Sequence, residues 1–333
     1  MAVLGITGAV VYAQRNPRFL LLLVLLLSLS TLLLLPWHPA SPLGTLQLSN
    51  YLPSKFRGSV SLEEFVRREE LRYADVLAQR QAMIKQYGPN PDDVDSFPGG
   101  SVFYTLWDFF LPAFNCPHRI DRVGAFGDGG KWVCGLDALA AQTHPCVVYS
   151  FGVNHDSSFE AALLQRAPAC EVWGFDYSVS AFGPEVQANP VLAPKAHFFP
   201  YKLGAHDNAH LAPPEYTIQE LMRANGHAFV DVLKVDIEGG EFDALAAFLK
   251  PFIGADAPPL PIGQLQIEIH AWGDNGRFGF FYPWWTLLER AGLRPFFTEP
   301  NMPHVSHMRA RPDVVEYSFI NVRGQHALIT SDW

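Results

Sequence analysis

Acidic residues and a lysine gather in one short stretch of this 333-residue chain, Asp231–Glu241. The first part of the stretch is apolar enough for a buried strand, whose alternation predicts Lys234, Asp236 and Glu238 on one face. Burying such a group of charges is costly unless the groups do chemistry or pair with one another. We therefore take this stretch as the first candidate for a catalytic site.

A second polar stretch lies at Gln264–His270, where Glu268 and His270 fall on the same face of a predicted strand. An imidazole or a carboxylate can remove a proton from a hydroxyl group during a reaction. We predict His270 as the general base, followed by Glu268, Asp236 and Glu238. The alternative is that these residues are ion pairs at the rim of a sheet. The carboxylates could also hold a divalent cation, but we predict no metal site.

A predicted strand-to-helix turn precedes both stretches, at Gly152, Val153 and Asn154. Glycine permits close approach of the backbone to a ligand, and asparagine tolerates left-handed geometry. Asp176 follows about 24 residues after Gly152, where nucleotide-binding βαβ units carry an acidic residue for ribose hydroxyls. Together these features predict a nucleotide-like cofactor; a purely structural turn and a solvated carboxylate are the alternatives. A nicotinamide-dependent oxidoreductase would need a Gly-x-Gly-x-x-Gly turn, which the chain lacks.

A sheet has to position these groups, and the rest of the sequence supplies its elements. Short apolar runs predict strands at Val147–Phe151, Glu171–Phe175, His197–Tyr201, Val230–Val235, Gln264–Ile269, Leu293–Phe297 and Tyr317–Val322. Helices are predicted at Ser158–Arg166, Thr217–Asn225, Glu241–Leu249 and Pro283–Ala291. This alternation indicates an α/β fold with a mostly parallel sheet and helices on both faces, in which ligands bind at the carboxyl ends of the strands.

Two further features bear on the site. Asp128 lies in a Gly-Asp-Gly-Gly turn between apolar stretches, which predicts a β-hairpin or a simple turn. Aromatic residues crowd the segment after the fifth strand, namely Trp272, Phe278, Phe280, Phe281, Tyr282, Trp284 and Trp285. They could form a wall for a sugar ring or an apolar acceptor, but their helical spacing favours core packing.

The motifs of the chain resemble those of methyltransferase-like proteins of the FkbM-related type. The resemblance covers about Cys116 to Val322 and rests on Gly127–Trp132, Ser150–Val153, Gly174–Asp176, Leu233–Glu241 and Gln266–His270. It implies a Rossmann-like, seven-stranded fold of the class I methyltransferase type, S-adenosylmethionine as cofactor, and O-methylation.

The same resemblance implies roles for single residues. Gly152, Val153 and Asn154 would face the methionine portion of the cofactor, Asp176 would bind its ribose, and the turn at Asp128 would lie over it. Lys234 is a further candidate cofactor contact. The family pattern has an acidic residue and more glycines in the first loop, where this chain has Ser150 and Asn154.

Composition excludes some partners. The chain has a formal net charge of -9, so we predict no nucleic-acid partner, because nucleic-acid binders carry a basic face. The four cysteines, Cys116, Cys134, Cys146 and Cys170, include no C-x-x-C pair, which argues against a zinc ribbon. They could be free thiols or form disulfides in any of three pairings.

The N-terminal part predicts a membrane anchor. Residues 19–35 are apolar or small hydroxyl residues, long enough to cross a thin bilayer. Arg15 and Arg18 precede this segment, so residues 1–18 are predicted to be cytosolic and the chain to be a single-pass type II protein of the endoplasmic reticulum or Golgi. A cleaved signal peptide is the alternative. The chain has no Asn-x-Ser/Thr acceptor, so glycosylation sites add no support for a lumenal address.

The segments after the anchor differ in character. Residues 36–60 are rich in proline and serine and predict a linker. A charged amphipathic helix is predicted at 61–88, begun by a Ser61–Glu64 capping box and ended by Gly88. It could be a stem, but its apolar residues favour docking on a domain that we predict at 97–333.

These observations together predict a membrane-anchored, S-adenosylmethionine-dependent methyltransferase that acts on a hydroxyl of a small-molecule or glycan acceptor. The alternative is a catalytically inactive, membrane-tethered binding module with the same fold, because fold alone does not prove activity.

Overall fold

A computed structural model describes residues 60–331 of the chain. The predicted cytosolic segment 1–18, the anchor at 19–35 and the linker up to residue 59 lie outside the described residues. Between residues 60 and 331, no helix is both long and apolar enough to cross a membrane.

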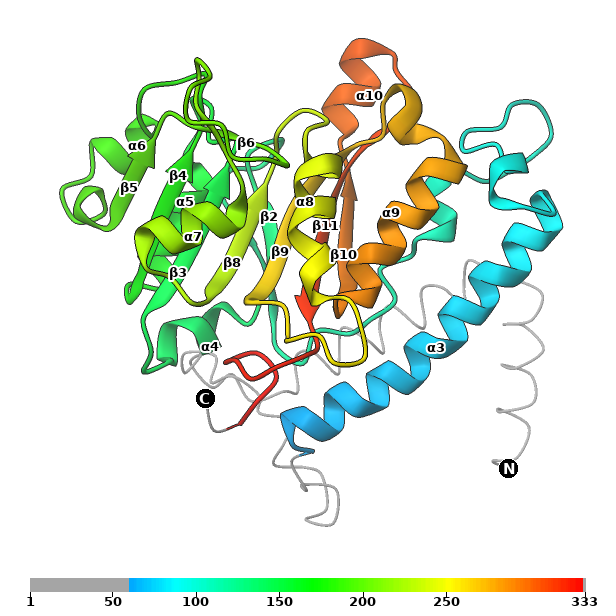
Figure 1. The fold of residues 1–333 in the computed structure, drawn as a ribbon, viewed down its shortest axis with the longest axis horizontal. Coiled ribbons are helices and arrows are strands. Elements are labelled where there is room, and N and C mark those ends of the chain that lie inside the picture. Colours follow the sequence, from blue (N-terminus) through cyan, green and yellow to red (C-terminus); the bar gives the residue numbers. More distant parts are fainter. Residues whose placement is uncertain (1–59, 332–333) are drawn as a thin grey trace, which may run out of the picture. The chain divides into compact units, whose positions relative to one another are not determined.

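Helices and strands alternate along most of the described chain (Figure 1). The α-helices are α3 (Leu62–Tyr87), α4 (Leu136–Ala141), α5 (Ser158–Arg166), α6 (Pro184–Gln187), α7 (Ile218–Asn225), α8 (Glu241–Leu249), α9 (Phe278–Arg290) and α10 (Met302–Met308). The strands are β1 (Ile120–Val123), β2 (Lys131–Cys134), β3 (Cys146–Phe151), β4 (Cys170–Phe175), β5 (Ala196–Phe199), β6 (Lys202–Leu203), β7 (Glu215–Tyr216), β8 (Val230–Val235), β9 (Ile262–His270), β10 (Leu293–Pro300) and β11 (Val314–Asn321).

Seven strands form the central sheet in the order β10-β11-β9-β8-β3-β4-β5. The β9, β8, β3, β4 and β5 neighbours pair in parallel, whereas β11 is antiparallel to both β9 and β10. The chain winds outward from β3 to β5 on one side and from β8 to β9 on the other. The switch point therefore lies between β3 and β8, where α/β sheets bind ligands. The prediction of a seven-stranded, mostly parallel α/β sheet is confirmed.

Both faces of the sheet are covered, as predicted. One core includes side chains of α7, α8 and α9, such as Leu221, Leu245 and Trp285, and Figure 1 shows these helices side by side in front of the sheet. The other core includes side chains of α4 and α5, such as Leu139 and Leu163. Two layers of helices thus bury the sheet and leave its strand ends open to ligands.

Two pairs of neighbouring segments are joined by disulfides. Cys116 is bonded to Cys134, which ties the segment before β1 to β2, and Cys146 is bonded to Cys170 at the starts of the paired strands β3 and β4. Of the alternatives that the sequence left open, the structure therefore has disulfides, and no described cysteine is free.

Helix α3 packs against the sheet domain. The Ser61 hydroxyl accepts a hydrogen bond from the backbone N–H of Glu64, so the predicted N-cap is confirmed. Arg80, in the second half of the helix, forms a buried ion pair with Glu289 of α9. These contacts agree with the docked helix rather than with a free stem.

Two details of the sequence interpretation were wrong. Helix α9 begins at Phe278 rather than Pro283, because Phe278 and Phe281 pack in the core and hold the extra turn despite the proline inside it. Strand β8 ends at Val235, so Glu238 lies in a turn at φ 54° and does not continue the alternation.

Candidate active site at the strand ends

A cavity of about 360 Å³ lies at the carboxyl ends of the central strands. Its walls include all six residues predicted to contact a cofactor, namely Asp128, Gly152, Val153, Asn154, Asp176 and Lys234. They also include three of the four residues predicted to act in catalysis, Asp236, Glu238 and Glu268. The fold therefore brings residues from separate strands to one enclosed site.

The first loop has the backbone geometry that its sequence predicts. Gly152 has φ 76°, and a Cβ atom there would lie 1.6 Å from the carbonyl oxygen of Asp236. Only glycine lets the ends of β3 and β8 approach this closely. Asn154 has φ 50°, the left-handed conformation that asparagine tolerates.

Asp176 follows β4 and fastens the first loop. Its Oδ2 accepts a hydrogen bond of 2.7 Å from the backbone N–H of Asn154, and its Oδ1 accepts two from Ser178. A carboxylate offers about four lone-pair positions, so this one can still accept from a diol. Its position in the cavity fits the predicted contact with ribose hydroxyls.

Lys234 stabilises the first loop, at Gly152. Its side chain is buried, and its Nζ donates to the carbonyl oxygen of Gly152 at 2.6 Å. The ammonium lies 4.0 Å from the carboxylate of Glu160, which supplies a counter-charge. Lys234 therefore lines the cavity and also holds the backbone of the loop in place.

A buried ammonium group, that of Lys131 on β2, contacts two carboxylates of the site. Its Nζ lies 3.0 Å from Oδ2 of Asp236 and also donates to Glu316 of β11. Burial alone would lower the pKa of Lys131, but Asp236, Glu316 and Glu268 together raise it above its ordinary value. Burial likewise opposes ionisation of Asp236, yet Lys131, Lys234 and His270 hold the pKa of its carboxyl below its usual range. Lys131 and Asp236 therefore form an ionised pair at neutral pH.

Glu268 of β9 also lines the cavity. One of its oxygens accepts a hydrogen bond of 2.8 Å from the side-chain amide of Asn301, which also donates to Asp128 at 2.8 Å. The other oxygen lies 3.4 Å from Nε2 of His270. Burial raises the pKa of Glu268, and the nearby charge of Asp236 adds to this effect. The pKa of Asp236 is lowered and that of Glu268 is raised, so Glu268 is the stronger base of these two carboxylates.

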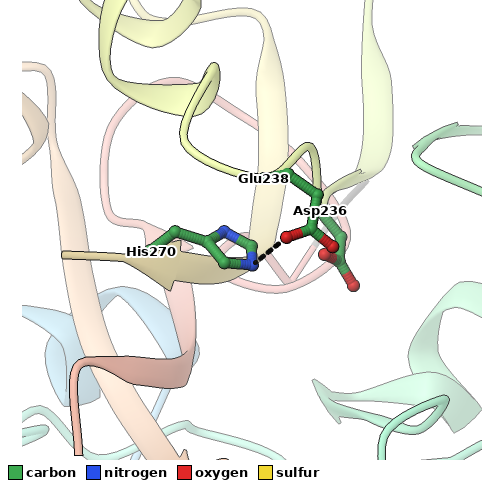
Figure 2. A group of neighbouring side chains, drawn as sticks. All are labelled: Asp236, Glu238 and His270. Carbon is green, nitrogen blue, oxygen red and sulfur yellow. Dashed lines mark ion pairs between the residues drawn. The ribbon is translucent and has the colours of Figure 1, made fainter. Parts of the chain in front are cut away.

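His270 is held between carboxylates. Figure 2 shows its imidazole pointing toward Glu238, with an Nε2 to Oε2 distance of 3.4 Å. On the other side, Nδ1 lies 3.2 Å from the buried carboxylate of Glu241. Burial would lower the pKa of His270, but Glu241 and Glu268 overcome this effect and raise it to about 10.

This environment argues against His270 as the general base. An imidazole that is already protonated at neutral pH cannot take a proton from an acceptor. Among the described residues that line the cavity, His270 is not found. Its Nε2 lies 3.4 Å from both Glu238 and Glu268, so His270 contacts two carboxylates of the cavity without lining it itself.

Two groups of side chains bring possible metal ligands within 4.8 Å of one another: Asp236 with Glu238 and His270, and Asp236 with Glu268 and Glu316. In the first group, Nε2 of the imidazole lies 3.4 Å from Glu238 and Nδ1 lies 3.2 Å from Glu241, so both ring nitrogens already face carboxylates. In the second, the Lys131 ammonium already contacts two of the three carboxylates.

Several contributors to the site were missed from sequence. Lys131, Asn301, Glu241 and Glu316 are far from the two polar stretches or were assigned no role. For Lys131 a signal was present, because it alternates with Val133 in the predicted hairpin and so had to face the interior. No local sequence pattern points to Glu316 or Asn301, which reach the site only when the chain has folded.

A family model described as a methyltransferase domain matches residues 75–320, a range that contains the sheet and the cavity. The chain belongs to this methyltransferase family and is an S-adenosylmethionine-dependent class I methyltransferase. None of the curated protein sequences compared with it matches the chain.

Solved structures show distant likeness. A fibrillarin pre-rRNA processing protein of Methanococcus jannaschii is 14% identical over 69% of this chain and 89% of its own, with a TM-score of 0.35. An O-methyltransferase family protein of Burkholderia thailandensis is 12% identical over 57% of this chain and 56% of its own, with a TM-score of 0.29. At these TM-scores the likenesses say nothing about the acceptor.

S-adenosylmethionine fits the residues of the cavity. Asp176 offers oxygens to a ribose diol, and the negative charges of Asp236 and Glu268 suit a sulfonium cation. The volume of about 360 Å³ lies within the usual range for small-molecule sites. The cofactor predicted from the resemblance is therefore confirmed by the family to which the chain belongs.

Proposed function

We propose that this methyltransferase methylates a hydroxyl oxygen of a small-molecule or glycan acceptor. The observation that carries the proposal is the shared cavity, in which Asp236 and Glu268 line the same space as Gly152 and Asp176. An alcohol has to lose a proton as it is methylated, and carboxylates beside the cofactor can receive it. The resemblance to FkbM-related proteins, itself still a prediction, agrees with this chemistry.

Different residues of the cavity have different roles in the proposed methyl transfer. S-adenosylmethionine supplies an activated methyl group on its sulfonium. Gly152, Asn154 and Asp176 hold the cofactor, so that donor and acceptor meet at near-attack distance. Glu268 accepts the hydroxyl proton, because burial raises its pKa and so makes it a stronger base. Asn301 and His270 fix the orientation of Glu268.

We also propose that the enzyme is a single-pass type II protein whose catalytic domain faces the lumen of the endoplasmic reticulum or Golgi. The apolar segment 19–35 and the arginines before it support this topology. The two disulfides support it further, because disulfides persist in oxidising compartments and are rare in the cytosol.

Methyl transfer by the full chain in detergent tests the proposed reaction. Labelled S-adenosylmethionine would be supplied with a panel of glycans and small alcohols, and each product digested to locate the methyl group. We expect transfer to oxygen, and a fall in kcat of about 100-fold or more for Glu268→Gln, because the proton acceptor is lost.

Glu171→Gln is the matched control, because Glu171 makes the same carboxylate-to-amide change at an exposed position of β4. Binding of S-adenosylmethionine, measured by calorimetry, should stay nearly equal in both variants. A protein that binds the cofactor and transfers methyl only to amines or carbon would contradict the proposed acceptor class.

A further inference from the structure

The ammonium of Lys131 lies at the position in the carboxylate cluster where a divalent cation would be expected. Asp236, Glu268 and Glu316 place one oxygen each within 4.8 Å of one another, a spacing compatible with a cation. Lys131 contacts two of these three carboxylates, and its side chain is only 1% exposed. A lysine this deeply buried stays charged because the carboxylates compensate it.

Lys131 has one N–H group more than it has acceptors among residues 60–331. An ammonium has three N–H groups, and in the described part of the chain its acceptors are Asp236 and Glu316 alone. Lys131 is among the residues that line the cavity, beside Asp236 and Glu268, so an acceptor bound in the cavity would lie next to the remaining N–H. One oxygen of Glu316, Oε2, is also buried without a partner among residues 60–331. The carboxylates thus surround the Lys131 ammonium, and the cluster still has one donor and one acceptor without partners among residues 60–331.

We propose that Lys131 is a catalytic residue of methyl transfer, donating its third N–H to the acceptor oxygen and taking the place that a divalent cation would otherwise hold. The inference rests on the proposed reaction at a hydroxyl. The acceptor oxygen forms its bond to the methyl carbon as the sulfur–carbon bond breaks, and the hydroxyl proton passes to Glu268. Lys131 keeps its proton and stabilises the negative charge that develops on the oxygen. The products are a methyl ether, S-adenosylhomocysteine and protonated Glu268.

This arrangement narrows the class of acceptor. Lys131 offers a donor and Asp236 and Glu268 offer acceptors within one cavity. Neighbouring neutral hydroxyls satisfy both at once, since one oxygen accepts from the ammonium while the next hydroxyl donates to Asp236. Vicinal diols, as found in sugars, are therefore the acceptors that fit.

The test removes the ammonium and asks whether a metal ion replaces it. The full chain and its Lys131→Ala variant would be titrated with Mn²⁺ by calorimetry, and turnover measured with and without EDTA. We expect wild-type turnover to be unaffected by EDTA, and Lys131→Ala to lose about 100-fold or more in kcat. Mn²⁺ should bind Lys131→Ala at least about tenfold more tightly than wild type, because three carboxylates are left without their cation, and should restore part of the lost rate.

Two further variants guard the interpretation. Lys250→Ala removes an exposed lysine and should leave both turnover and Mn²⁺ binding unchanged. If Lys131→Ala does not fold, Lys131→Met with Glu316→Gln removes opposite charges together; it should bind S-adenosylmethionine and still lose turnover. Wild-type turnover that needs a divalent cation would overturn the inference, as would wild-type rates in the double variant.

The two proposals fail in different ways. If wild type methylates no hydroxyl, the proposed reaction fails, and the Mn²⁺ titration still tests the position of Lys131. If wild type methylates hydroxyls but Lys131→Ala neither gains Mn²⁺ affinity nor loses rate, only the inference about Lys131 fails.

Discussion

At the scale of single residues, the environment of a side chain decides what it can do. His270 and Glu268 are two positions apart on one strand, yet the structure assigns them different tasks. His270 has carboxylates on both sides that raise its pKa, whereas burial and the neighbouring charge of Asp236 raise the pKa of Glu268. In the proposed reaction, the imidazolium of His270 therefore orients Glu268, and the carboxylate of Glu268 accepts the proton.

The charge on His270 predicts a pH dependence of stability. Its pKa is raised from 6.5 to about 10 on folding, so the native state binds one proton more than the unfolded state between these values. The stabilisation is complete below pH 6.5 and is lost as the pH rises toward 10. Over this window the free energy of unfolding should fall by up to about 1.4 kcal/mol per pH unit more in wild type than in His270→Gln.

Denaturant unfolding at several pH values between 6.5 and 10 measures this difference. The comparison with His270→Gln cancels the titration of all other groups that the two proteins share. Parallel pH profiles of the two proteins would show that His270 is neutral in the fold, and would return it to consideration as a base.

At the scale of elements, α3 is fastened to the domain by a buried polar cluster rather than by apolar contacts alone. Arg80 donates to both oxygens of Glu289, which also accepts from Tyr73 and Trp285. The side chain of Arg80 is 3% exposed. Breaking a pair of this kind leaves an uncompensated buried charge.

Arg80→Met should therefore lower the free energy of unfolding by about 3–5 kcal/mol. Arg67→Met provides the control: Arg67 belongs to the same helix and also pairs with a glutamate, but its side chain is 62% exposed, so the loss should be below about 1 kcal/mol. Chemical denaturation of the two variants measures both values. If Arg80→Met loses no more free energy of unfolding than Arg67→Met, the buried ion pair with Glu289 adds no more stability than the exposed pair of Arg67.

At the scale of the whole molecule, the proposed lumenal orientation can be tested through glycosylation. The chain has no Asn-x-Ser/Thr acceptor, so any glycan has to come from an introduced site. His210→Thr converts the exposed run Asn208-Ala209-His210 into such an acceptor. If residues 60–331 face the lumen, this variant should gain mass that an endoglycosidase removes.

His210→Ala is the matched control, since it changes the same side chain without creating an acceptor. Both proteins would be expressed in cells with a secretory pathway and compared by gel mobility. Absence of a glycan on His210→Thr in membrane-associated protein would place the domain on the cytosolic side and contradict the proposed topology.

Local patterns in the amino-acid sequence predict the elements and most of the lining of the site. The strands, the N-cap at Ser61 and the turn at Gly152 and Asn154 follow from such patterns, which depend on residues a few positions apart. Because the carboxyl ends of parallel strands meet at one edge of a sheet, the predicted strands also bring Asp176, Asp236 and Glu268 to the same place.

Which of these groups carry a proton, and which group faces the acceptor, depends on the tertiary structure alone. Lys131 reaches Asp236 across 105 positions and Glu316 across 185, and no periodic pattern spans such separations. The charge of His270 likewise depends on Glu241, which lies on helix α8 and not on the strand that carries His270. A pKa depends on the burial and charge of all neighbours in space, so it becomes defined only when the chain has folded.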